Sequence, residues 1–140
     1  MTPGQAWIDI DTTSGVWAHL KIRNDGTEPL RIHNPHTEAP TDGWEHSKEA
    51  YQAAVLRSYG FLSLELRDGE GTPVESLPVH ARAGHIVALP LELAPGAQLD
   101  IAVPVDELYP LEPGSDYHLS LDYGDEAGRY LATEEFRAPG

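Results

Sequence analysis

Apolar and polar residues alternate along most of the chain, which is the pattern of β-strands with one buried face. In residues 16–23 the apolar set is Val16, Ala18, Leu20 and Ile22, and every other position is a larger polar or amphipathic residue. The alternation recurs in seven further segments, which are 6–10, 29–34, 61–67, 86–93, 99–103, 117–123 and 129–136. The pattern predicts an all-β sandwich of seven to eight short strands, formed by a single domain of residues 1–140.

Residues 35–57 interrupt this alternation between the third and fourth predicted strands. The first half has the composition of a loop. In the second half Ser47 is placed to cap a short helix in which Tyr51, Ala54 and Val55 share a face. A connection of this length is uncommon in a small domain unless it is functional or has structure of its own. It is therefore expected to be either a crossover between sheets or a binding loop.

The segment LEPGSDYHLSLDY resembles the tyrosine corner of fibronectin type III and related immunoglobulin-like sandwiches. The corresponding positions are Leu111, Pro113, Gly114 and Tyr117. The resemblance implies that the Tyr117 hydroxyl bonds back to the backbone of the preceding turn. The fold that it implies is an immunoglobulin-like antiparallel β-sandwich, with one long crossover that contains a short helix.

Two longer segments, IRNDGTEPLRI (22–32) and residues 91–123, resemble a pair of small bacterial sandwich families. These are the accessory β-domain that precedes deuterolysin-like metalloproteases and the intracellular proteinase inhibitors of bacilli. The deuterolysin motif His-Glu-x-x-His is absent, so the resemblance implies no proteolytic activity. No Gly-x-Ser-x-Gly nucleophile motif or phosphate-binding loop is present either. We therefore expect a protein that is not an enzyme and needs no cofactor.

Charge and composition narrow the classes of partner. The 140 residues include 23 acidic and 9 basic side chains and no cysteine, for a formal charge of −14. Without cysteine there is no disulfide framework, thiol nucleophile, zinc ribbon or iron–sulfur site. So negative a chain lacks the cationic surface that nucleic-acid binding requires. No apolar run approaches the ~20 residues of a membrane-spanning helix, and the N-terminus lacks the features of a secretory signal, so we expect a cytoplasmic protein.

Acidic residues are concentrated in the C-terminal third, where residues 100–136 carry ten carboxylates and a single arginine, Arg129. The early strands carry a mixed or mildly basic set on their polar face, consisting of His19, Lys21, Arg23, Arg31 and His33. One interpretation is solubility alone. The other is a non-catalytic module that binds a cationic protein, as an inhibitor or immunity protein does. In that hypothesis the 34–47 loop contributes apolar area through Trp44, and the C-terminal strands contribute the carboxylates of Asp122, Asp125 and Glu126.

Three alternatives stay open at the level of sequence. A histidine-rich loop could bind zinc, or serve a carbohydrate-directed module, through His33, His36 and His46 with the nearby acids Glu38, Asp42 and Glu45. The acids Asp122, Asp125 and Glu126 could hold calcium at a hairpin turn. The domain could also be a structural accessory of a larger assembly, or a homodimer paired through an open sheet edge.

Overall fold

Ten strands and two helices form among the residues that the computed structural model describes, which are 4–38, 47–77, 85–86, 90–126 and 128–139. The strands are β1 (Gly4–Asp11), β2 (Trp17–Asn24), β3 (Leu30–Ile32), β4 (Thr37–Glu38), β5 (Leu62–Asp68), β6 (His85–Ile86), β7 (Leu91–Leu93), β8 (Gln98–Pro104), β9 (Asp116–Asp125) and β10 (Gly128–Arg137). The helices are α1 (Lys48–Ser58) and α2 (Val105–Leu108). The chain is therefore all-β in class, as the alternation predicts. The expected count of seven to eight strands was too low, because the two-residue strands β4 and β6 are too short to show a period.

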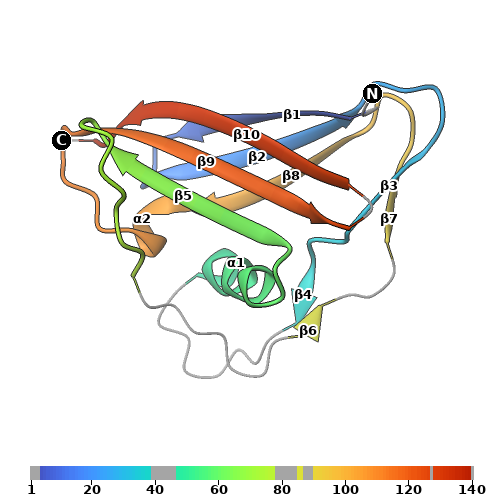
Figure 1. Ribbon diagram of the computed structural model, residues 1–140, viewed down its shortest axis with the longest axis horizontal. Coiled ribbons are helices and arrows are strands. Elements are labelled where there is room, and N and C mark those ends of the chain that lie inside the picture. Colours follow the sequence, from blue (N-terminus) through green and yellow to red (C-terminus); the bar gives the residue numbers. More distant parts are fainter. Residues whose placement is uncertain (1–3, 39–46, 78–84, 87–89, 127, 140) are drawn as a thin grey trace.

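Two three-stranded sheets form the body of the molecule (Figure 1). One has the order β1-β2-β8 and the other β10-β9-β5, and all neighbouring strands are antiparallel. Two small sheets, β3-β7 and β4-β6, stand apart from these layers. The predicted strand 86–93 is not a single described strand, because Pro90 falls between β6 and β7 and residues 87–89 lie outside the described part.

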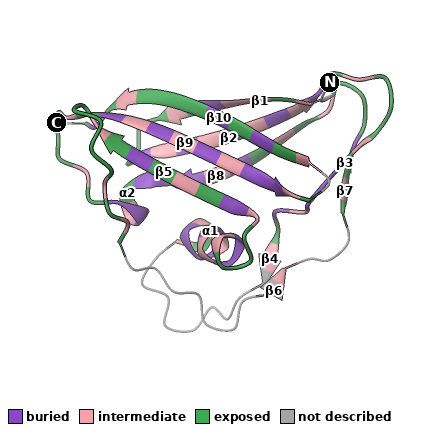
Figure 2. Ribbon diagram, viewed as in Figure 1, coloured by how far each residue is buried: buried purple, intermediate pink, exposed green. Residues whose placement is uncertain are grey.

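The inner faces of the two main sheets supply one hydrophobic core. On β2 every second residue is buried, and on β9 the buried positions alternate in the same way (Figure 2). Fully or almost fully buried side chains on the two strands are Ala18, Leu20, Ile22, Tyr117, Leu119, Leu121 and Tyr123. The period-two pattern therefore identified the core faces of these strands correctly, because a strand exposes alternate side chains to opposite sides of its sheet.

The sheets approach each other at one edge and are bridged by a helix at the other. Strand β1 lies against β10, where Gly4 packs on the ring of Tyr130. At the opposite edge α1 contacts both β8 and β5 (Figure 1). The helix begins as predicted, since the Ser47 side chain accepts a hydrogen bond of 3.1 Å from the backbone nitrogen of Ala50. Its predicted buried face is only partly correct, because Tyr51 and Val55 are buried but Ala54 is half-buried.

The turn before β9 is held in the way that the tyrosine-corner resemblance implied. The backbone nitrogen of Glu112 donates a hydrogen bond of 2.7 Å to the Tyr117 hydroxyl. Gly114 adopts a φ of 79° within the same turn, a conformation that favours glycine. The expected tie between Tyr117 and the turn backbone is therefore confirmed.

Candidate functional site

The three predicted acids of the C-terminal strands gather at the turn that joins β9 to β10. Asp122 and Asp125 belong to β9, and Glu126 follows in the turn. The turn depends on Gly124, whose φ of 146° is unfavourable for other residues. We call this part of the molecule, residues 122–126 with the adjoining start of β10, the hairpin end.

Asp122 is already used inside the hairpin end. Its carboxylate accepts a hydrogen bond of 2.9 Å from Arg129 Nε. The same guanidinium donates through Nη1 to the carbonyl oxygens of Gly60 and Gly124, both at 3.2 Å. Asp122 therefore positions Arg129 as a clamp between the hairpin and the segment after α1. The sequence analysis grouped Asp122 with the acids that contact a partner. Because Asp122 is paired with Arg129 inside the molecule, it is less suited to that role.

A hollow of about 520 Å³ opens beside the clamp. Its lining consists of Tyr59, Gly60, Phe61, Asp125, Glu126 and Arg129. Tyr59 is the unexpected member, because its side chain is 51% exposed although it is large and aromatic. The signal that could have identified it is its place directly after α1 and before Gly60, where φ is 81° and the chain turns back toward β5.

His33 lies behind this hollow and is buried, with 7% of its surface exposed. Its ring stacks on Phe61 at a centroid distance of 3.7 Å, and its backbone carbonyl accepts a hydrogen bond from the Tyr123 hydroxyl. The Nε2 atom is buried and has no hydrogen-bond partner among the described residues. Burial lowers the pKa of His33, and the negative charge of Asp125 offsets part of this effect. The imidazole is thus a neutral, stacked element of the core beneath the site.

The metal hypotheses concern two sets of side chains, those of the histidine-rich loop and those of the acids at the hairpin end. No group of three His, Asp or Glu side chains able to hold a metal ion occurs in the described ranges. Asp122, Asp125 and Glu126, all of which are described, do not form such a group. For the histidine-rich loop, His33 and His36 are described, whereas His46 lies outside the described residues, as does Trp44. Of the two described histidines, His33 is stacked on Phe61.

The stability of the folded chain should depend on pH through His33. In the unfolded chain this imidazole titrates near its ordinary pKa of about 6.5, but in the folded chain its pKa is lower. Below about pH 6.5 the unfolded state therefore binds the extra proton, and the free energy of unfolding falls as the pH decreases, by at most ~1.4 kcal/mol per pH unit. Urea unfolding from pH 5 to pH 8 measures this dependence.

The matched variant for this measurement is His33→Phe, which keeps a ring against Phe61 and removes the titration. The difference in unfolding free energy between wild type and variant should shift in favour of the variant as the pH falls. A difference that stays constant between pH 5 and pH 8 would show that His33 is not the titrating group.

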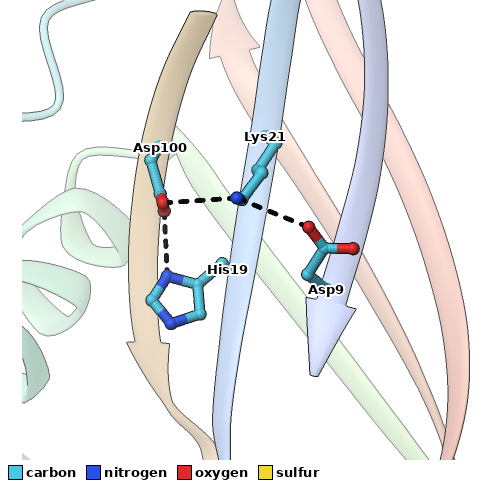
Figure 3. Close-up of polar contacts among 4 residues, drawn as sticks. All are labelled: Asp9, His19, Lys21 and Asp100. Atoms are coloured by element: carbon cyan, nitrogen blue, oxygen red, sulfur yellow. Dashed lines mark hydrogen bonds and ion pairs between the residues drawn. The ribbon is translucent and has the colours of Figure 1, made fainter. Parts of the chain in front are cut away.

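The outer face of the other main sheet carries a polar network of four residues (Figure 3). His19 Nδ1 lies 3.0 Å from Asp100 Oδ1, and Lys21 Nζ lies 3.4 Å from Asp9 Oδ2 and 3.9 Å from Asp100 Oδ2. Antiparallel pairing produces the network, because β1 and β8 place the carboxylates of Asp9 and Asp100 on either side of Lys21 on β2. The face is mixed in charge, one of the two options expected, and its cations are neutralised locally.

This local pairing of cations extends over the described surface. Six Lys and Arg side chains have a carboxylate oxygen at 2.5–3.4 Å, and they are Lys21, Arg23, Arg31, Arg67, Arg129 and Arg137. Exposed ion pairs of this kind add little to stability. They affect the charge distribution instead, because each pair neutralises a positive side chain of a chain that has a formal charge of −14. The net charge that remains on the surface is therefore negative.

No protein-family model and no curated protein matches the chain. Among the described residues, no helix has the length and apolar character needed to cross a bilayer.

Proposed function

We propose that this chain is a non-catalytic acidic module that binds a cationic protein, in the manner of an inhibitor or immunity protein, and does so in the cytoplasm. The observation that carries the proposal is the pairing of cations described above, which leaves the surface with an excess of carboxylates. Such a surface attracts a basic partner over several ångströms and raises its association rate about 10- to 1000-fold at low salt. A protein with balanced charge would not have this property.

Two features support the absence of catalysis in this proposal. The described His–carboxylate pairs, His19–Asp100 and His118–Glu135, both lie on outer sheet faces. No Ser or Thr hydroxyl in the described ranges is hydrogen-bonded to an imidazole, and the hydroxyls that donate a bond donate it to a carboxylate or a backbone carbonyl. An activated hydroxyl nucleophile needs such a base.

An immunoglobulin-like topology is part of the same proposal. In each three-stranded sheet the middle strand pairs with its hairpin neighbour, and it pairs with the third strand across a long connection, as β2 does with β8 and β9 with β5. The hydrogen bond between Tyr117 and the Glu112 backbone supports it as well. In such sandwiches, the turns at the ends of the strands are common binding surfaces.

The hairpin end is the contact surface that the geometry favours. Its acids Asp125 and Glu126 and the exposed aromatic residue Tyr59, which lies beside it, line one hollow. Aromatic residues supply much of the binding energy at protein interfaces, and carboxylates bind Arg or Lys of a partner with charge-assisted hydrogen bonds. Trp44, the other aromatic residue expected to contribute, lies outside the described residues.

The double substitution Asp125→Lys with Glu126→Lys should slow association with the partner about tenfold or more at low salt, without unfolding the domain. The partner is first captured on the immobilised wild-type chain, identified and purified, and its association rate is then measured at about 20 mM and 300 mM salt. Asp122 is left unchanged because lysine at that position would face Arg129 and break the clamp.

The matched control carries Glu70→Lys and Glu112→Lys, which change the net charge equally. These two residues line a hollow of about 640 Å³ beyond the opposite end of β9. The control should slow association much less. If both double variants slow it equally, only the net charge matters and the hairpin end is not the docking surface. If neither has an effect, the charge-driven proposal is wrong.

A further inference from the structure

The hollow at the hairpin end has the chemistry of a pocket for one planar cation. We infer that it receives an arginine side chain of the partner, with the guanidinium over the Tyr59 ring and hydrogen-bonded to the carboxylates of Asp125 and Glu126. This inference rests on the proposed function, because it names the group of the cationic partner that the same site recognises. Three observations carry it: the arrangement of the rings, the balance of charge and the use of Arg129.

Three aromatic rings lie nearly parallel beneath and beside the hollow. His33 stacks on Phe61 with an interplanar angle of 18°, and Phe61 stacks with Tyr59 at 14° and a centroid distance of 6.3 Å. Exposure increases from the buried His33 through the half-buried Phe61 to Tyr59. Stacking on Phe61 supports Tyr59 from one side, so an exposed aromatic surface is already oriented before any ligand arrives. A preoriented ring loses little conformational freedom on binding.

The charges of the side chains around the hollow favour the binding of one added cation. Arg129 is opposed by Asp122 at 2.9 Å, so their charges largely cancel. The lining also contains the acidic side chains of Asp125 and Glu126. Glu126 is exposed and forms no ion pair with any residue in the described part of the chain. Its carboxylate is therefore available to a partner.

The clamp also argues against an anionic ligand. Arg129 uses its Nε and Nη1 donors on Asp122 and on the carbonyl oxygens of Gly60 and Gly124, and its charge is opposed by Asp122, while the acids of the lining repel an anion. A metal ion is disfavoured as well, since no group of three suitable ligands occurs in the described ranges. Arginine fits better than lysine because its guanidinium is planar, stacks on aromatic rings and is more weakly hydrated.

Titration with N-acetyl-arginine amide, followed by two-dimensional ¹H–¹⁵N NMR, tests the inference directly on the full chain. We expect saturable shifts at the amides of Gly60, Asp125, Glu126 and Arg129. The neutral analogue N-acetyl-citrulline amide should bind at least about tenfold more weakly, because it keeps the planar shape but lacks the charge and has a carbonyl oxygen in place of one NH2 group. Equal binding of both compounds would overturn the inference.

Two substitutions assign the effect to the pocket. Tyr59→Leu keeps an apolar side chain and removes the π-system, and it should weaken binding of the arginine compound about two- to fivefold. Glu126→Gln should weaken binding by a similar factor. The controls Leu77→Ala, another exposed apolar side chain, and Glu112→Gln, an acid at the far end of β9, should leave the affinity unchanged.

The outcomes separate this inference from the proposed function. If no saturable binding occurs, or if Tyr59→Leu has no effect, the arginine pocket is wrong, although docking of a cationic protein through Asp125 and Glu126 can still stand on its own measurement. If sodium phosphate shifts the same amides and the arginine compound does not, the hollow is an anion site and the inference is likewise wrong. If the arginine compound binds but the lysine substitutions at Asp125 and Glu126 leave the association rate unchanged, the proposed function fails instead.

Discussion

Replacement of Gly124 by alanine is expected to lower the free energy of unfolding by about 3 kcal/mol or more. A Cβ atom at this position would lie 2.1 Å from the carbonyl oxygen of Gly128 and 2.8 Å from Arg129 Cα. Both atoms belong to the backbone of the opposing strand, so no side-chain rotation can relieve the overlap. The φ of 146° adds conformational strain for any residue with a side chain. Urea unfolding followed by circular dichroism measures the change.

The control for this prediction is Gly71→Ala. Gly71 also has a positive φ, 83°, but no atom lies within 4 Å of the added Cβ. Its substitution should therefore cost only the local strain, about 1 kcal/mol. If the two alanine variants lose the same stability, the close approach of β9 and β10 at Gly124 does not determine the cost. Because Gly124 also accepts a bond from Arg129, its substitution should displace the clamp as well.

Asn24→Ala is expected to destabilise the fold by about 3 kcal/mol. The Asn24 side chain is fully buried. Its Nδ2 atom donates to the carbonyl oxygens of Glu28 and Leu93, at 2.7 Å and 2.9 Å, and its Oδ1 atom accepts from Gly26 at 2.9 Å. One side chain thus joins the end of β2 to the following turn and to the end of β7. Alanine removes all three bonds, including the buried one to the Leu93 carbonyl oxygen.

A weaker version of the same interaction provides the comparison. Asn34 makes one side-chain bond, in which its Oδ1 accepts from the His36 backbone at 3.0 Å, and it is only half-buried. Asn34→Ala should cost about 1 kcal/mol or less. Equal losses for Asn24→Ala and Asn34→Ala in chemical denaturation would mean that the buried bonds of Asn24 contribute no more than a peripheral one.

The candidate site was accessible to sequence reasoning only in part. The acidic turn could be placed because Gly124 and Gly128 interrupt the alternation and identify a hairpin. The pairing of Asp122 with Arg129 was missed, although both residues flank that turn and hairpin register would have brought them together. The position of Tyr59 between α1 and Gly60 marks it as a residue at a chain reversal, but its place beside the hairpin depends on how the chain after α1 meets β9 and β10.

The arrangement of the histidines shows the limit of spacing arguments. His33 alternates with apolar neighbours and follows Ile32, which suggested a polar face near a loop. In the folded chain its ring is covered by Phe61, which is distant in sequence, and its carbonyl is bound by Tyr123. Similarly, Glu107 was counted among the acids of the surface, but its carboxylate accepts a bond of 2.8 Å from the Ser47 backbone and holds the start of α1.

By itself the sequence determined the all-β class, the buried faces of the long strands, the cap of α1 at Ser47 and the bond from Tyr117 to its turn. These properties depend on residues within a few positions of one another, where strand period, capping and turn geometry act directly. Only the tertiary structure decided which charges neutralise each other, that His33 is buried, and that Tyr59 shares a hollow with Asp125 and Glu126. Those outcomes depend on which strands pair and in which register, a choice made by the whole core rather than by any single segment.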